Sequence, residues 1–342
     1  FKKLEKHELE KTLSLNRQEK ELIQNIFIIL NNIFLAEKQN FDPLIKKYML
    51  TWLKISRNYF ALSYNNLKKK SLPKEIWFGS ISSNIHSSLL AYTALEKNVK
   101  IVAHDHGNGD AFHKQFANNL FEYNFCSHYF SYNSNQAKIK SQSLVKDLKF
   151  NISKNRPKFI FNENKLSNKQ VTIKKKIKNI MYLSTALHAE RMRFRPIFQD
   201  YQYCDWQIRL LKFLSKENRV YYKPHPERFQ INMNFLKNKN VNIIQKKKFE
   251  DLKYNVDCYV IDFISSSTTK LVLESNAIVI FFDTGYLKLS SKAYTLLKKR
   301  CYIIKLSEDK LNRLKTDWKN LETVLKKKEH KFSYEFYNFY FC

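Results

Sequence analysis

The chain has 342 residues, of which 44% are hydrophobic and 15% aromatic, which is enough for a packed core and excludes a wholly disordered protein. Lys and Arg number 61 against 31 Asp and Glu, and the formal charge of +30 favours anionic partners. Because the basic residues are spread along the whole chain, this charge favours an anionic membrane surface over nucleic acid.

The first elements in the chain are expected to be helical. Over residues 1–70, apolar positions recur at helical spacing, and Ser71-Leu72-Pro73 breaks the pattern. Strands and helices then alternate, which predicts parallel strands joined by a helical crossover. The expected strands of this first run lie at 75–78, 100–103 and 121–132, around a helix at 83–97.

A second alternation follows a stretch rich in Lys, Asn and Ser, residues 151–176, which is interpreted as a linker. Its strands are expected at 179–184, 219–222, 241–244, 258–261, 277–282 and 301–304, and its helices at 205–216, 267–275 and 308–328. The aromatic tail at 332–341 is expected to pack back onto the fold.

This order predicts an α/β protein with two Rossmann-like domains facing a cleft and a helical N-terminal segment. The alternative is a single mixed α/β domain with helical decoration. The expected parts are a helical segment at 1–70, a first Rossmann-like domain at 71–150, the linker at 151–176, a second such domain at 177–330 and the tail at 331–342.

The loop A-H-D-H-G-N-G-D-A at 103–111 follows an expected strand. Histidine is a natural general base near neutral pH, and glycine lets backbone amides approach a phosphate or sugar closely. We therefore predict a catalytic or substrate-contacting loop whose members are His104, His106, Asp110, Gly107 and Gly109. The alternatives are structural histidines, or an H-x-H metal site, for which no further ligand series is visible.

The stretch V-Y-Y-K-P-H-P-E-R at 220–228 places one histidine between two of the chain's six prolines. Proline forces extended backbone on the residue before it, so Lys223 and His225 are expected on a stiff loop after a strand. Lys223, His225 and Arg228 could bind a phosphate. The alternative is a turn whose histidine makes a structural hydrogen bond.

Hydroxyl residues follow two other expected strands. In D-F-I-S-S-S-T-T-K-L-V-L-E at 262–274 they open a helix, whose first amides can bind an anion. The candidates there are Ser265, Ser266, Ser267 and Thr268, with Glu274 as a ribose ligand or a plain surface residue. Ser184 and Thr185 end the earlier strand and are further candidates for donor binding. Arg193 lies in the basic loop that follows and could contact the donor or the acceptor; the alternative is a solvated surface loop.

These motifs in this order resemble the GT-B glycosyltransferases of capsule and surface-polysaccharide synthesis, including polysialyl and Kdo transferases and CDP-glycerol glycerophosphotransferases. The resemblance covers residues 72–285 and depends on H-G, K-P-H-P and the D-x-x-S-S-S helix start. It implies that His225 and Ser265 to Thr268 bind the donor phosphate and that His106 is the base. No acidic D/E-D/E-G motif is present, so His104 and Asp110 remain alternatives to His106.

The sequence thus predicts a metal-independent glycosyltransferase that needs no cofactor. It would move a sugar, or a glycerol-phosphate-like group, from a nucleotide-activated donor such as a CMP- or CDP-linked one to a polysaccharide or lipid-linked acceptor. Five dispersed cysteines without a C-x-x-C pair indicate a reduced cytoplasmic location, and lipid-linked acceptors would place the enzyme at the inner membrane face. The alternatives are an RNA- or polyanion-binding protein, although no nucleic-acid-binding motif is found, and a sugar-nucleotide epimerase of the same build.

Overall fold

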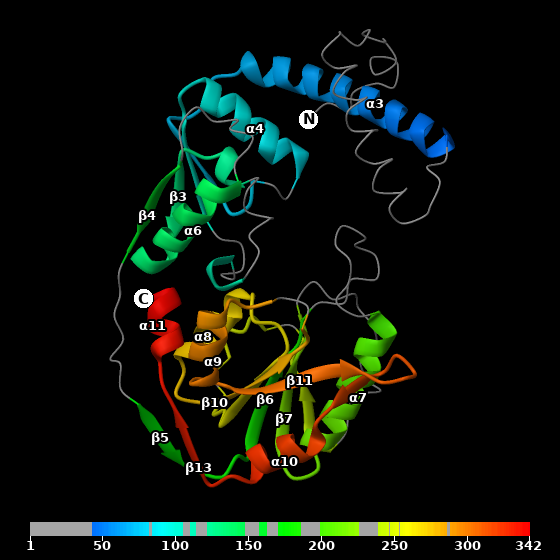
Figure 1. The fold of residues 1–342 in the computed structure, drawn as a ribbon, viewed down its shortest axis with the longest axis vertical. Coiled ribbons are helices and arrows are strands. Elements are labelled where there is room, and N and C mark those ends of the chain that lie inside the picture. Colours follow the sequence, from blue (N-terminus) through cyan, green and yellow to red (C-terminus); the bar gives the residue numbers. More distant parts are fainter. Residues whose placement is uncertain are drawn as a thin grey trace.

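The structure is a computed structural model of the chain, and it contains two mainly parallel β-sheets with helices packed on them and a small two-stranded antiparallel sheet (Figure 1). The α/β class expected from the sequence is confirmed, whereas the division into two domains and their boundaries stay predictions. The described residues are 43–81, 84–104, 110–113, 122–147, 157–162, 170–185, 199–225, 239–245, 247–252, 254–285 and 288–342.

The N-terminal sheet has four parallel strands in the order β1-β2-β3-β4. Its strands are β1 (Glu75–Phe78), β2 (Lys100–His104), β3 (His128–Ser131) and β4 (Lys158–Phe161). The helices beside them are α3 (Pro43–Lys68), α4 (Ile85–Glu96), the short 3-10 helix η1 (Asp110–Phe112) and α6 (Ser134–Asp147). Asn84 caps α4, because its side chain accepts a hydrogen bond from the Ser87 amide at 2.8 Å.

The C-terminal sheet has seven strands in the order β12-β11-β10-β9-β6-β7-β8. They are β6 (Asn179–Leu183), β7 (Arg219–Lys223), β8 (Val241–Ile243), β9 (Cys258–Ile261), β10 (Ile278–Asp283), β11 (Tyr302–Glu308) and β12 (Leu314–Thr316). All pairs are parallel except β11 with β12. The connecting helices are α7 (Asp200–Leu214), α8 (Ser267–Glu274), α9 (Ser291–Lys298) and α10 (Trp318–Lys326).

Both faces of the C-terminal sheet are buried, which explains why its central strands are nearly continuous apolar runs. Successive side chains point to opposite faces, so Tyr182 and Tyr222 pack with Trp206 of α7 on one face. Met181 and Tyr221 belong to the core on the other face, which α8, α9 and the C-terminal helix cover. Helices therefore sandwich this sheet, as in α/β folds generally.

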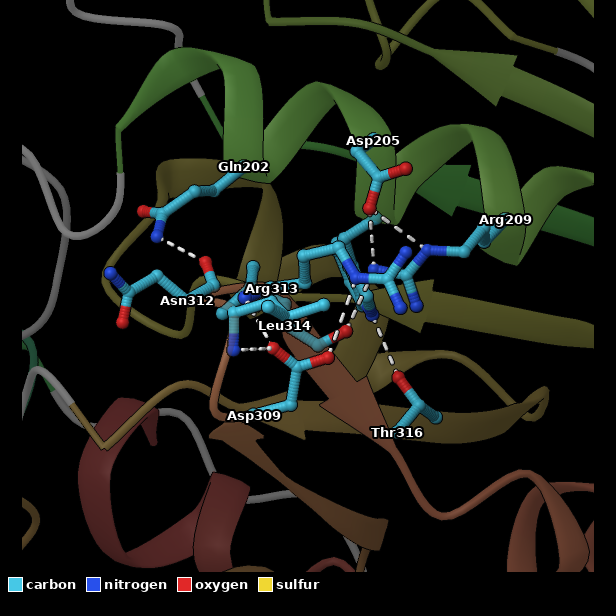
Figure 2. Close-up of polar contacts among 10 residues, drawn as sticks. Gln202, Asp205, Arg209, Asp309, Asn312, Arg313, Leu314 and Thr316 are labelled. Atoms are coloured by element: carbon cyan, nitrogen blue, oxygen red, sulfur yellow. Dashed lines mark hydrogen bonds and ion pairs between the residues drawn. The ribbon is translucent and has the colours of Figure 1, made fainter.

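Polar contacts tie α7 to the edge of the C-terminal sheet (Figure 2). Arg209 donates to the Leu314 carbonyl at 2.8 Å and also pairs with Asp205 on its own helix. The indole of Trp206 donates to Thr316 Oγ1 at 2.8 Å, which satisfies two buried polar atoms. These bonds fix the antiparallel edge strand β12 against α7.

The last two elements connect the two sheets. Strand β13 (Glu329–Phe332) pairs antiparallel with β5 (Val171–Lys174), and helix α11 (Glu335–Phe341) packs against α6, α8 and α9 (Figure 1). Asn133 donates to the Phe339 carbonyl at 3.1 Å, and Gln136 donates to the Tyr340 carbonyl at 2.5 Å. These two amides satisfy carbonyls that the end of α11 would otherwise leave unpaired, which fixes the helix on α6.

Several expectations need correction. The helix expected at 308–328 is wrong in its first half, because Leu314–Thr316 pairs with β11 as strand β12 and only Trp318–Lys326 is helical. The alternation of apolar and polar residues that marks a strand cannot be recognised over only three residues next to an amphipathic helix. The expected linker at 151–176 contributes β4 and β5. Of the helical segment at 1–70, Pro43–Lys68 forms α3, and 1–42 lie outside the described residues.

Among the described residues, no helix combines the length and the apolar character that crossing a membrane requires. All five cysteines are free thiols.

Candidate functional site

The strand order of the C-terminal sheet reverses at β6. From this strand the chain builds outward to β7 and β8 on one side, and then returns to add β9, β10 and β11 on the other. In open parallel sheets, ligands bind beyond the carboxyl ends of the strands at such a reversal. The carboxyl ends of β6 and β9 are therefore the candidate site.

The sheet register brings two of the predicted stretches to these strand ends. Leu183, the last residue of β6, pairs with both Lys223 of β7 and Ile261 of β9, so the residues that follow each strand lie at one level. The Ser184 amide donates to the Lys223 carbonyl at 3.2 Å and continues the ladder one step further. Ser184 and His225 thus extend from neighbouring strand ends at the same edge.

Lys223 is buried, at 7% exposure, and its ammonium donates to the Pro224 carbonyl at 3.3 Å. Burial lowers the pKa of Lys223, while the charge of Glu250 opposes that change. The ammonium consequently lies against the turn that leads to His225. Lys223 supports the proline-bracketed turn directly, and any bound anion would also experience its charge.

The start of α8 has an unusual capping arrangement. Ser266 occupies the N-cap position with extended backbone, but its side chain makes no capping hydrogen bond. Its hydroxyl pairs instead with Thr268 Oγ1 at 2.8 Å. The Thr269 amide donates to the Ser266 carbonyl at 3.0 Å, but the Ser266 side chain caps neither the Ser267 nor the Thr268 amide. A helix N-terminus in this state attracts anions.

Asp262 directly follows the last residue of β9 and is 1% exposed. It accepts hydrogen bonds from the Tyr182 hydroxyl at 2.5 Å, the Thr185 amide at 2.9 Å and the Tyr203 hydroxyl. The carboxylate thereby fixes the end of β6 to the end of β9. Its position directly after an apolar strand was visible in the sequence, but its two tyrosine partners, on β6 and α7, come from distant parts of the chain.

Burial raises the pKa of Asp262 to about 6, against the opposing effect of its hydrogen bonds. The folded protein therefore binds this proton more tightly than the unfolded chain, in which the pKa is near 3.8. The stabilisation is fully present below pH 3.8 and is lost as the pH rises through about 6. Relative to Asp262→Asn, the wild type should lose about 2 kcal/mol of unfolding free energy between pH 4 and pH 7.

Urea unfolding of both proteins at the two pH values measures this difference. Asp309→Asn is a suitable control, because a hydrogen bond from the Arg313 amide lowers the pKa of Asp309 and its effect should have the opposite sign. Parallel pH profiles for the wild type and Asp262→Asn would show that the buried carboxyl does not titrate in this window.

A histidine from the N-terminal part of the chain contacts the serine-rich start of α8. His113 Nε2 lies 2.5 Å from Ser265 Oγ, and the histidine is only 9% exposed. Burial lowers the pKa of His113 to about 4, so the imidazole is neutral at pH 7. This residue lies two positions beyond the predicted catalytic loop and was missed, because a contact across 152 residues leaves no local pattern.

Other predicted residues lie elsewhere. His104 ends β2 at the edge of the N-terminal sheet, where its ring faces Gly79, and Asp110 begins η1. Glu274 is the last residue of α8, about 10 Å along the helix from the serines, and hydrogen bonds with Tyr337, so the structure does not bring it to the candidate site. His106, Gly107, Gly109, Arg193 and Arg228 lie outside the described residues.

The opposite edge of the C-terminal sheet contains a cavity of about 280 Å³. Asp257, Asn276 and Ile278 line it near the starts of β9 and β10, and none of the predicted site residues does. Among the described residues, no group of three His, Cys, Asp or Glu side chains could hold a metal ion. The strand ends around β6 thus remain the candidate site.

Two similar solved structures are the S. aureus MnaA–UDP complex and the Methanocaldococcus jannaschii UDP-GlcNAc 2-epimerase with UDP-GlcNAc and UDP. The first is 11% identical, covers 79% of this chain and 72% of its own, and has a TM-score of 0.46. The second is 12% identical, covers 80% and 75%, and also has a TM-score of 0.46.

A search of curated proteins finds no match. The sequence model of the LIC12162 family transferase matches residues 7–299, which is most of the chain. The chain therefore belongs to the LIC12162 transferase family, and the expectation of a transferase is confirmed at that level.

Proposed function

We propose that this transferase moves a sugar, or a glycerol-phosphate-like group, from a nucleotide-activated donor to a surface-polysaccharide or lipid-linked acceptor. The proposal is supported by one observation: Ser184, His225 and the start of α8 all follow the carboxyl ends of neighbouring strands, β6, β7 and β9. Hydroxyls, an imidazole and open helix amides suit a diphosphate better than an uncharged ligand.

Such a transfer requires stabilisation of the departing phosphate and a general base for the acceptor hydroxyl. As the bond between the transferred group and the donor phosphate breaks, negative charge grows on the departing phosphate, and the dipole of α8 with His225 would stabilise it. A base must also take the proton of the acceptor hydroxyl as that oxygen forms the new bond. We assign this role to the segment 104–110 after β2, in which His104, His106 and Asp110 are the candidates.

The nucleotide requirement can be tested with the wild-type protein. Thermal unfolding is followed with CMP, CDP, UDP and GDP, each at about 100 times its dissociation constant, which should add about 2.7 kcal/mol to the stability of the folded state. At least one nucleotide is expected to raise the melting temperature, with CMP or CDP favoured. If none does, the donor proposal fails.

Turnover with and without acceptor separates the alternatives. A transferase should release the nucleotide in proportion to transfer onto an added oligosaccharide or lipid-linked glycan, and an acceptor at the inner membrane face would make activity depend on lipid vesicles. An epimerase would convert the nucleotide sugar without any acceptor. A polyanion-binding protein would instead bind RNA with a steep salt dependence and turn over nothing.

A further inference from the structure

His113 is held in place by both its neighbours and its own backbone. Its main chain forms an antiparallel bridge with Leu289, and the Ser290 amide donates to the Phe112 carbonyl at 2.8 Å. The adjacent Phe112 is fully buried and packs against the α11 rings of Phe336 and Tyr340, at centroid distances of 5.6 and 5.4 Å. Such anchoring fixes the position of the imidazole before any ligand binds.

The imidazole uses only one of its two nitrogens within the described chain. Nε2 contacts Ser265 Oγ, whereas Nδ1 is buried and has no hydrogen-bond partner among the described residues. A neutral imidazole carries one N–H, so either Nε2 donates to the serine, or the serine donates to Nε2 and the N–H is on Nδ1. In both tautomers the pair retains one hydrogen for which the described residues provide no acceptor.

The location of that hydrogen depends on the tautomer, and in one of the two it is on Ser265, two residues before the first turn of α8. If Nε2 donates, the Ser265 hydroxyl hydrogen is available to a ligand next to the amides of Ser267 and Thr268. If Nδ1 carries the proton, the ring itself has a donor that needs an acceptor. A buried donor without an acceptor costs stability, so an anionic oxygen that accepts it would be bound favourably.

We infer that His113 is a positioning residue, which orients the Ser265 hydroxyl so that it donates to a phosphate oxygen at the start of α8. This inference builds on the proposed function, because it assigns the residue that prepares the donor-phosphate site. It also makes the N-terminal part of the chain a contributor to that site, through a contact already present without ligand.

The test is a double-mutant cycle with inorganic pyrophosphate as the probe, measured by isothermal titration calorimetry. His113→Ala and Ser265→Ala should each weaken pyrophosphate binding about tenfold, the effect of losing one hydrogen bond to a charged group. Because His113 acts through Ser265, the double variant should also be only about tenfold weaker. His113→Gln places an amide where Nε2 was and should restore most of the affinity.

His330→Gln is the matched control. His330 is another buried histidine, 1% exposed, and contacts the Tyr302 hydroxyl and the Lys327 carbonyl far from α8 in the chain. Its replacement should lower the melting temperature without changing the dissociation constant of pyrophosphate. If His113→Ala does not fold, comparison of His113→Gln with Ser265→Ala still decides the question.

Three results would overturn the inference: no binding of pyrophosphate by the wild type, single effects that multiply to about a hundredfold in the double variant, or a His113→Gln variant as weak as Ser265→Ala. If only the proposed function is wrong, the results differ. The pyrophosphate affinities of the single and double variants would still agree with the inference, but no nucleotide would stabilise the protein and no group transfer would occur.

Discussion

Arg300→Met is expected to lower the free energy of unfolding by about 3 kcal/mol. Arg300 is 2% exposed, and its guanidinium donates to the carbonyls of Leu273 at 2.9 Å, Ser275 at 2.7 Å and Ala277 at 3.1 Å. It also lies over the Phe332 ring at 4.3 Å. Methionine fills a similar volume but removes the guanidinium donors, so that of the three carbonyls the Ser275 carbonyl keeps the Tyr334 hydroxyl at 3.3 Å as a donor. A buried carbonyl that loses its donor is the costly half of losing a hydrogen bond.

Urea denaturation of the wild type and the variant measures the loss. Arg313→Met is the control, because the Arg313 side chain is 61% exposed, pairs with Asp309 at the surface and should contribute less than about 1 kcal/mol. Equal stabilities for the two variants would show that the buried guanidinium contributes no more than a surface one. Because Arg300 binds the last turn of α8, the same variant should also weaken nucleotide binding at the other end of that helix.

His225→Ala is expected to reduce kcat for transfer by about a hundredfold or more, the usual effect of removing one donor to a developing oxyanion. The imidazole follows β7 on the stiff Pro224 turn, beside the end of β6, so its loss should not disturb the sheet. The measurement is steady-state nucleotide release with saturating acceptor, together with the melting temperature of the variant.

An exposed histidine provides the comparison. His86 lies on α4 and contacts the Tyr59 hydroxyl, so His86→Ala should keep the wild-type kcat. If His225→Ala retains activity within about twofold of the wild type while still folding, His225 does not bind the departing phosphate, and the turn has a structural role instead.

The sequence was sufficient for features that depend on local chemistry. Apolar strands such as Asn179–Leu183 and Cys258–Ile261, and the helix after Ser266, appear where alternation and capping residues predicted them. Ser184 and His225 were also placed correctly at strand ends, since a strand that stops in polar residues exposes them at a sheet edge. Their roles stay predictions.

The features that the sequence did not reveal depend on long-range contacts. In the sequence Arg300 cannot be told from other basic residues, and its role follows only from its hydrogen bond to the Leu273 carbonyl at the end of α8. In the same way, the contact of His113 with Ser265 depends on the folded chain, because the two residues are 152 positions apart. The three residues of β12 carry too little periodicity to compete with a nearby amphipathic helix. Such partners are set by tertiary packing, for which a single sequence contains no direct signal.

The late position of β13 and α11 in the chain has a consequence for synthesis on the ribosome. Both sheets can form as the polypeptide emerges, but Phe112 and Asn133 must wait for α11, about 200 residues later, before they are covered. The nascent chain therefore exposes an aromatic surface for most of its translation, which is when chaperones would bind it. A nonsense mutation just before Glu335 should consequently yield an aggregating product even though every strand of both sheets is encoded.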